Sequence, residues 1–171
     1  VYGIVKNHGG HIDVSSEQNK RTTFQIYLPA SENKILQETP TVENLPELKA
    51  TLLLVDDETI ILEVTQQMLE RLGYHVLVAK SGSQALELYS ENQDRVDAVI
   101  LDMTMPNMSG GETFDRLMGM NPEIMVLLSS GYSIDGKAEE ILARGCKGFI
   151  QKPFAMAELS RRLRQLLDGS V

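Results

Sequence analysis

Short apolar runs alternate with longer segments of helical periodicity from about residue 51 to the end of the chain. Runs such as LLLV at 52–55 and AVIL at 98–101 have the length and composition of strands buried on both faces. Helical patterns separate these runs, as is typical of parallel strands joined by crossover helices. We therefore predict an α/β domain over residues 51–171, built on a five-stranded doubly wound parallel sheet. The five strands are expected near 51–55, 75–79, 97–101, 124–128 and 147–150.

The predicted helices carry apolar residues at helical spacing and end at glycines. The first helix carries Ile60, Ile61, Val64, Met68, Leu69 and Leu72 at helical spacing. Gly73 and Gly145 follow the first and fourth helices, where a left-handed residue commonly ends a helix. The last helix, near 155–167, is expected to bury Leu159, Leu163, Leu166 and Leu167 and to leave its arginines in solvent.

Residues 1–30 follow a different pattern, which predicts a short α+β segment. The stretch VYGIVKNHGG has the pattern of the last turns of a helix closed by glycines, and residues 11–15 and 23–28 alternate as hairpin strands do. Two strands and a helical stub cannot bury a stable core, so we interpret this segment as an incomplete remnant of a larger domain that begins upstream. Residues 31–50 mix polar residues with two prolines and lack periodicity, which predicts a linker.

Charge and composition favour protein partners and a cation over nucleic acid or membrane. The chain of 171 residues has a formal net charge of -8, and no separate basic region could read DNA. No run approaches the roughly 18 apolar residues of a membrane span, and no basic-then-apolar leader opens the chain. We therefore expect a cytoplasmic protein that contacts neither nucleic acid nor membrane. The single Cys146 cannot form an internal disulfide and is interpreted as a small core residue.

Charged side chains follow three of the predicted strands at the point where each strand ends. Asp56 and Asp57 close LLLVDDE, Asp102 closes AVILDM, and Lys152 follows GFIQ. Because the carboxyl ends of parallel strands meet at one edge of the sheet, these residues should converge there. Three carboxylates at short range repel one another unless a cation neutralises them. Mg²⁺ prefers oxygen ligands of this kind, so the sequence predicts a magnesium site.

The same residues predict phosphoryl transfer. One of the acids can act as a nucleophile and form an aspartyl phosphate. Lys152 is placed to neutralise charge on the transferred phosphoryl oxygens, and the hydroxyl of Ser130, at the end of MVLLSSG, could bind another of them. Each residue alone also has a purely structural explanation. The acid pair could serve to stabilise a helix N-terminus, and Ser130 could serve to cap a helix. The combination of three acids and a lysine favours the functional interpretation.

Four motifs resemble those of the receiver domain of two-component response regulators. They are LLLVDDE, LDMTMPNMSG, LLSSGY and FIQKPF, which follow the family's order within residues 51–171. The resemblance implies a flavodoxin-like sheet with strand order 2-1-3-4-5. Asp102 would be the phosphoacceptor and a ligand of Mg²⁺. Asp57 and the Thr104 backbone carbonyl would also hold the metal, with Asp56 acting through the metal's water shell.

The resemblance assigns further roles near the carboxyl ends of the last two strands. Ser130 and Lys152 would bind the phosphoryl group and move toward its charge. Phe149 takes the place of the family's switch aromatic, here without a hydroxyl, and its packing would follow, together with the face formed by the fourth and fifth helices. The Lys152–Pro153 peptide bond is expected to be cis. The donor would be a phosphohistidine on a histidine kinase or on a histidine phosphotransfer protein.

Residues 1–30 resemble the end of the ATPase domain of sensor histidine kinases. The similarity lies in YGIVKNHGGHIDVSSEQNKRTTFQIYLP, with Asn19-Lys20-Arg21 where the family usually has Gly-Lys-Gly. The ATP-binding motifs of that family would lie upstream of Val1, so no ATP-dependent kinase activity is expected from this chain. The order of ATPase end, linker and receiver is that of the C-terminal part of a hybrid histidine kinase.

Other functions are compatible with parts of this pattern. A phosphatase of the haloacid dehalogenase type also uses an aspartate nucleophile with Mg²⁺ and lysine, but it needs a general acid two residues later, where this chain has Thr104. A flavodoxin-like electron carrier would bind phosphate in its first loop, which Asp56, Asp57 and Glu58 would repel. A third alternative is a binding module that signals without phosphorylation, for example by forming a homodimer.

Overall fold

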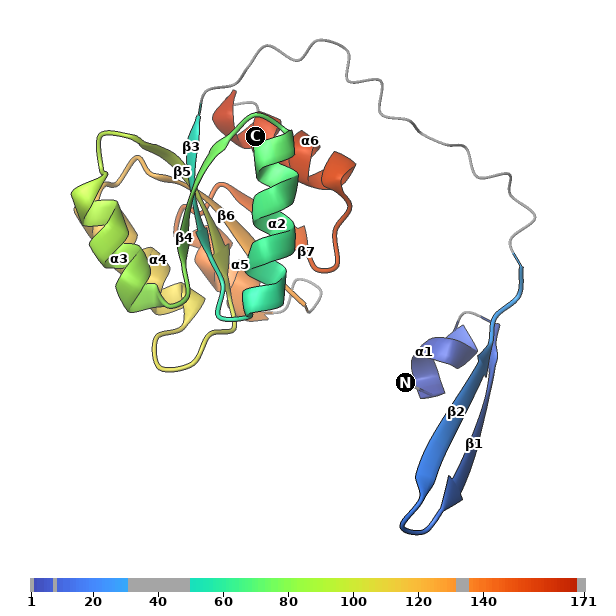
Figure 1. The fold of residues 1–171 in the computed structure, drawn as a ribbon. Helices are drawn as coiled ribbons and strands as arrows, with labels where there is room; N and C mark the ends of the chain where they lie inside the picture. The colour runs from blue at the N-terminus through green and yellow to red at the C-terminus, as the bar shows by residue number, and fades with distance from the viewer. Residues whose placement is uncertain (1, 8, 31–49, 132–135, 169–171) are drawn as a thin grey trace. The chain divides into compact units, whose positions relative to one another are not determined.

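A computed structural model describes residues 2–7, 9–30, 50–131 and 136–168 of the chain (Figure 1). The chain divides into two compact units, one within residues 1–41 and the other within residues 42–171. The predicted linker, apart from Ala50, lies outside the described residues. In the part of the chain that the structure describes, no helix combines the length and apolar character needed to cross a lipid bilayer.

The larger unit is built on five parallel strands. Their bounds are β3 Thr51–Val55, β4 His75–Ala79, β5 Val96–Asp102, β6 Met125–Ser130 and β7 Gly148–Gln151. The strands lie in the order β4-β3-β5-β6-β7, which confirms the expected 2-1-3-4-5 topology. In the parallel register, Leu54 of the central strand β3 pairs with Val78 of β4 and with Ile100 of β5. The predicted strands therefore all exist, and their ends differ by at most two residues from the expected bounds.

Five helices cover the two faces of this sheet. They are α2 Thr59–Arg71, α3 Gly82–Glu91, α4 Gly110–Met120, α5 Gly136–Ala143 and α6 Met156–Leu167. Figure 1 shows α3 and α4 on one side of the sheet and α2 and α6 on the other. Helix α5 belongs to the side of α3 and α4, because its Ile141 lies in the same buried cluster as Tyr89 and Phe114.

The alternation of side chains along each strand separates two apolar cores. Leu53 and Val55 of β3 face the core beneath α3, α4 and α5. Leu52 and Leu54 face the other core, beneath α2 and α6. Because both faces are covered, the buried positions 52–55 of β3 need apolar residues, which explains the unbroken run LLLV. Burial of each of these leucine side chains stabilises the fold by about 1.5–3 kcal/mol.

Helix α2 buries only some of its apolar residues. Leu62 and Leu69 are buried, but Ile60 is 75% exposed and Val64 is 48% exposed. At about 100° per residue, Ile60 and Val64 lie on the side of the helix opposite Leu62 and Leu69. The six apolar residues at helical spacing therefore do not share one buried face, because together they span more than one side of the helix.

The predicted helix ends agree with the structure. Gly73 has a φ of 91° after α2, and Gly145 has a φ of 107° after α5, so both glycines take the left-handed conformation expected of them. Helix α6 buries Leu159, Leu163 and Leu166, as predicted, whereas Leu167 is only partly buried.

The smaller unit consists of one helix and one hairpin. Helix α1 spans Tyr2–Asn7, and the antiparallel strands β1 and β2 span His11–Glu17 and Arg21–Tyr27. Asn19 has a φ of 59° and supplies the left-handed residue of the turn, a position at which asparagine can replace glycine.

One face of the hairpin carries uncovered apolar side chains. Val14 pairs with Phe24, and the alternation of the strands places Ile26 on the same face. These three side chains are at least half exposed. Within the described residues, this unit therefore leaves an apolar face without a covering layer.

Candidate functional site

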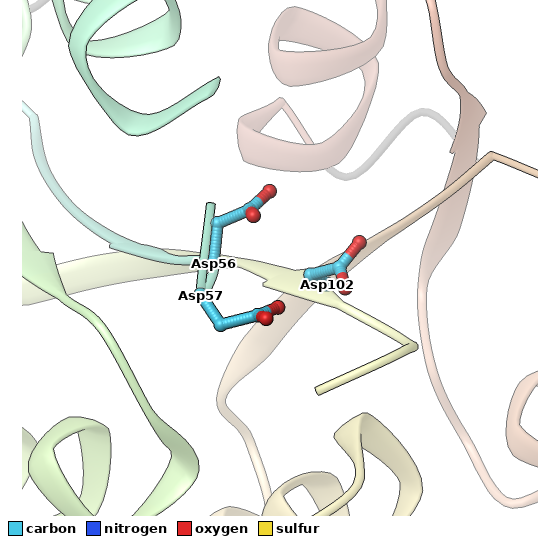
Figure 2. A group of neighbouring side chains, drawn as sticks. All are labelled: Asp56, Asp57 and Asp102. Atoms are coloured by element: carbon cyan, nitrogen blue, oxygen red, sulfur yellow. The ribbon is translucent and has the colours of Figure 1, made fainter. Parts of the chain in front are cut away.

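Three carboxylates meet at the carboxyl edge of the sheet, as the sequence predicts. Asp56 and Asp57 follow β3, and Asp102 ends the neighbouring strand β5. Figure 2 shows the three side chains gathered on one side of the two strand ends. One carboxylate oxygen from each lies within 4.8 Å of the others. Asp56 and Asp102 are buried, whereas Asp57 is partly exposed, so the cluster opens to solvent on the side of Asp57.

Backbone amides fix the orientation of the two buried carboxylates. The Glu58 N–H donates to Oδ1 of Asp56 at 3.0 Å, and the Thr104 N–H donates to Oδ2 of Asp102 at 2.9 Å. The Asp56 N–H in turn donates to the carbonyl of Ala79, at 3.2 Å, which ties the turn after β3 to β4. Each carboxylate therefore bonds to an amide two residues later, a local geometry that needs no long-range partner.

Lys152 lies between the two buried carboxylates. Its Nζ donates to Oδ2 of Asp56 and to Oδ1 of Asp102, both at 2.5 Å. The backbone N–H of Lys152 donates to the carbonyl of Ser130 at 2.7 Å, which positions the lysine relative to β6. The Lys152–Pro153 peptide bond is cis, as the resemblance implied.

Burial and charge set the protonation of this cluster. Burial raises the pKa of the Asp102 carboxyl, and the hydrogen bond and charge of Lys152 offset that effect only in part. Burial alone would lower the pKa of the Lys152 ammonium, but its hydrogen bonds to Asp102 and Asp56 outweigh burial, so the pKa is raised. The lysine is therefore charged at neutral pH, and the ionised form of Asp102 is less stable than it would be in water.

The donor set fits a hard divalent cation. A metal ion in a protein is commonly held by three or more acidic, histidine or cysteine side chains. Within the described residues, one such group is compact enough to hold an ion, and it consists of Asp56, Asp57 and Asp102. All three offer oxygen, which Mg²⁺ prefers, and neither imidazole nor thiolate accompanies them. Thr104, whose amide is bonded to Asp102, lies at the same strand end.

A groove of about 650 Å³ adjoins the acid cluster. Its lining includes the polar residues Thr104 and Ser130 and the apolar residues Met105 and Ile141. Ser130 ends β6 and is 4% exposed. The hydroxyl-bearing residue predicted from MVLLSSG thus lies on the strand next to that of Asp102, whose register partner is Ser129.

Phe149 lies on β7, three residues before Lys152. Its side chain is partly buried and packs against the core formed by α3, α4 and α5. It also lines a second groove with Phe154 and Arg162 at the junction of β7 and α6. Phe149 is thus accessible from the surface on one side and in contact with the core on the other.

The structure brings Asp56, Asp57, Asp102 and Lys152 together. Ser130 and Phe149 lie on the strands β6 and β7, and Thr104 and Pro153 lie in the loops after β5 and β7. Sequence reasoning missed the exposed pair on α2 described above, although a helical wheel would have separated it from the buried leucines. It also missed the ion pair of Asp115 with Arg144, which lines the groove beside Ser130. No sequence signal marks a pair 29 residues apart, with one residue in α4 and the other directly after α5.

Comparison of the sequence with known proteins agrees with this geometry. The profile of the response regulator receiver domain family matches residues 52–164. The sensor kinase CckA of Brucella abortus (strain 2308) is 36% identical over 177 aligned positions, which cover 98% of this chain and 19% of the relative. The chain therefore spans about a fifth of the length of this curated relative.

Two solved structures share the fold of the larger unit. A crystal structure of a response regulator receiver domain protein from Clostridium thermocellum has a TM-score of 0.68 and 29% identity, and the match covers 71% of this chain and 96% of that one. A chain in the crystal structure of the CheX-CheY-BeF3-Mg+2 complex from Borrelia burgdorferi has a TM-score of 0.65 and 26% identity, with 68% and 87% covered.

Proposed function

This chain belongs to the response regulator receiver family, and from that premise we propose that Asp102 accepts a phosphoryl group from a phosphohistidine and that the receiver then signals to a protein partner. The observation that carries the proposal is the position of Asp102. It is a buried carboxylate that contacts a lysine, beside two further acids at one edge of the sheet. Such a site can bind both a cation and a phosphoryl group.

Mg²⁺ is the proposed cofactor. Asp56, Asp57, Asp102 and the Thr104 carbonyl would hold it, with Asp56 acting through bound water. When bound, the ion supplies positive charge that neutralises the acids and polarises the phosphoryl oxygens. Two observations support this assignment: the all-oxygen donor set, and the presence of Mg²⁺ with BeF₃ in the related Borrelia complex.

Asp102 is the proposed nucleophile. One of its carboxylate oxygens attacks the phosphorus, the P–N bond to the donor imidazole breaks, and the electron pair of that bond remains on the imidazole nitrogen. The Thr104 amide and the Lys152 ammonium each bind one oxygen of Asp102, so the carboxylate is already oriented before the donor arrives.

Lys152 and Ser130 are the proposed phosphoryl-binding groups. Transfer places roughly 1.5 to 2 negative charges at the strand end. The Lys152 ammonium would neutralise part of this charge, and the Ser130 hydroxyl would bind one phosphoryl oxygen. The packing of Phe149 against the core of α3, α4 and α5 offers a route by which the change could reach the surface of β7.

The smaller unit supports an origin in a hybrid histidine kinase. We propose that residues 1–30 are the end of an ATPase domain, 31–50 a linker and 51–171 the receiver. The similarity to a sensor kinase extends over 98% of the chain, so it includes the hairpin as well as the receiver. The uncovered face formed by Val14, Phe24 and Ile26 is what a hairpin would show if the rest of its sheet belonged to a preceding segment.

The exposed pair on α2 is the proposed contact for the phosphohistidine donor. Helix α2 begins two residues after Asp57, so its first turns lie beside the acid cluster. Ile60 and Val64 are one turn apart on its exposed face. A donor whose histidine reaches Asp102 must cover this region, and burial of the two side chains would contribute to its affinity.

Replacing this pair with polar residues tests the donor contact. We expect Ile60→Ser with Val64→Thr to slow transfer from a phosphorylated histidine phosphotransfer protein about tenfold. This factor corresponds to about 1.4 kcal/mol, which is less than full burial of even one such side chain and fits partial burial of the two in the contact. Phosphorylation by acetyl phosphate should be unchanged, because a small donor makes no such contact. Rapid-quench transfer assays would measure both rates.

Met120→Ser serves as the matched control for that pair, because Met120 is also an exposed apolar residue but lies at the end of α4. Both variants should retain the parent's unfolding free energy within about 0.5 kcal/mol. Equal slowing by the α2 and α4 variants would contradict a specific contact at α2.

Intact-mass spectrometry after incubation with acetyl phosphate tests the proposed function. In the presence of Mg²⁺ the chain should gain one phosphoryl group, and with EDTA it should gain none. Peptide mapping should place the label on the segment that contains Asp102, as an acyl phosphate that hydroxylamine releases. Rapid release of inorganic phosphate without an adduct would favour a phosphatase, and neither adduct nor release would favour a binding module.

A further inference from the structure

Helices α4 and α5 approach each other closely beside the acid cluster. A Cβ added at Gly111 would lie 3.3 Å from Cδ1 of Ile141 and 3.6 Å from Nη2 of Arg144. Helix α4 is itself fixed to the strand of Asp102, because the Gly110 N–H donates to the carbonyl of Met103 at 3.1 Å. Because α4 is fixed to this strand end, any shift of α5 relative to α4 is also a shift relative to Asp102, the proposed phosphoacceptor.

One ion pair joins the two helices next to this contact. Nη1 of Arg144, directly after α5, donates to both carboxylate oxygens of Asp115 in α4, at 2.6 and 2.5 Å. The Arg144 Nε also donates to the Glu140 carbonyl at 3.3 Å, which holds the guanidinium against the end of α5. Among the described residues, every other ion pair lies within one helix, within the hairpin or in the acid cluster.

Helix α5 follows the strand of Ser130 in the chain, and its last residues adjoin the ion pair. Ser130 ends β6, and α5 begins six residues later at Gly136. The other end of α5 is attached to α4 through Arg144. The groove lined by Thr104 and Ser130 is also lined by Asp115 and Arg144, so the ion pair borders the same groove as these two residues.

We propose that the Asp115–Arg144 ion pair is a latch that holds α5 against α4 in the unphosphorylated receiver and opposes phosphorylation. The inference rests on the proposed function, in which Ser130 moves toward the phosphoryl group. Movement of Ser130 would pull the start of α5 with it, and because α5 is short, the whole helix would shift as a unit. The ion pair then has to lengthen, so its energy is lost in the phosphorylated state.

The expected size of the effect is modest. The side chains of Arg144 and Asp115 are 44% and 49% exposed, and exposed ion pairs contribute little because solvent screens them. Removing the latch should therefore tighten the binding of a phosphoryl analogue by about two- to fivefold. High salt should reduce this difference, because screening already weakens the pair in the parent.

Titration calorimetry with beryllium fluoride in excess Mg²⁺ tests the latch. Arg144→Gln is the decisive variant, because removal of a positive charge near the site would weaken anion binding if only electrostatics operated. The latch predicts the opposite, a two- to fivefold gain in affinity. Asp115→Asn should give a similar gain, the double variant should gain no more than either single variant, and the exchange of the two residues, Asp115→Arg with Arg144→Asp, should restore the parent's affinity.

Glu112→Gln is the matched control, because it removes the ion pair of Glu112 with Arg116 inside α4 and the same charge as Asp115→Asn. It should change the affinity less than Asp115→Asn does. Unchanged or weaker binding by Arg144→Gln would overturn the latch while leaving the proposed function intact. A parent chain that does not bind beryllium fluoride at all would remove the proposed function, and the latch with it.

Discussion

Replacing Asp102 with asparagine should abolish phosphorylation of this chain. The amide has the size and hydrogen-bonding shape of the carboxylate but lacks the anionic oxygen that attacks phosphorus, so we expect the rate with acetyl phosphate to fall at least about a hundredfold. Intact mass after incubation with Mg²⁺ and acetyl phosphate would show an adduct on the parent and none on the variant. Asp94→Asn, at an exposed acid in the loop before β5, should retain the adduct.

The same variant should be more stable than the parent. The raised pKa of Asp102 means that the folded state favours its protonated form. That contribution is complete below the usual pKa of the carboxyl and is lost as the pH rises through the raised value, so at neutral pH the parent carries a carboxylate that destabilises it.

We expect a gain of about 0.5–2 kcal/mol for Asp102→Asn at neutral pH, the range common for single stabilising substitutions. Urea denaturation without Mg²⁺, at neutral and at mildly acidic pH, would measure it, and the difference should shrink toward acid. A loss of stability at neutral pH would mean that the contact of Asp102 with Lys152 outweighs burial. Retention of the phosphoryl adduct would show that another residue is the acceptor.

Replacing Gly110 with alanine should have the largest effect on stability. A Cβ at this position would lie 2.3 Å from the carbonyl oxygen of Asp102 and 2.7 Å from the Cα of Met103. Both neighbours are backbone atoms, which cannot turn aside as a flexible side chain can. We expect a loss of about 2–4 kcal/mol in unfolding free energy, together with slower phosphorylation because the strand end that carries Asp102 must shift.

Gly119→Ala provides the matched comparison within α4. A Cβ at Gly119 meets no atom within 4 Å, and alanine favours helix over glycine by about 0.5–1 kcal/mol. This variant should therefore be slightly more stable than the parent and should be phosphorylated at the same rate. Urea denaturation of both variants would check the pair, and equal destabilisation by the two alanines would refute the packing argument at Gly110.

The sheet and its acid cluster were predictable because local pattern determines both. An apolar run such as LLLV, bounded by polar residues, is typical of a strand covered on both faces, and the position of Asp56 after that run places it at the carboxyl edge. The convergence of Asp102 and Lys152 followed from the parallel arrangement. These inferences needed only the type of each element and the place where it ends.

The features that were missed depend on which side of a helix a residue occupies and on contacts between distant elements. Ile60 looked like a core residue because it fits a helical repeat, but the buried side of α2 is centred on Leu62 and Leu69. The pairing of Asp115 with Arg144 depends on the packing of α4 against α5, which the sequence of neither helix specifies. The contact of Lys152 with Asp56 as well as Asp102 likewise required the final geometry.

The proposed reaction of this receiver depends on the strand ends, and its contacts with partners depend on helix surfaces. These two parts of the fold tolerate sequence change to different degrees. Hydrogen bonds from Met103 to Ser129 and from Lys152 to Ser130 link the ends of β5, β6 and β7. A mutation that shifts one of these strand ends disturbs all of the proposed reacting residues, so selection can change this region little without loss of the proposed reaction. Helix surfaces such as that of α2 carry no such constraint. Descendants of one receiver can therefore exchange partners and responses while inheriting the same reaction unchanged.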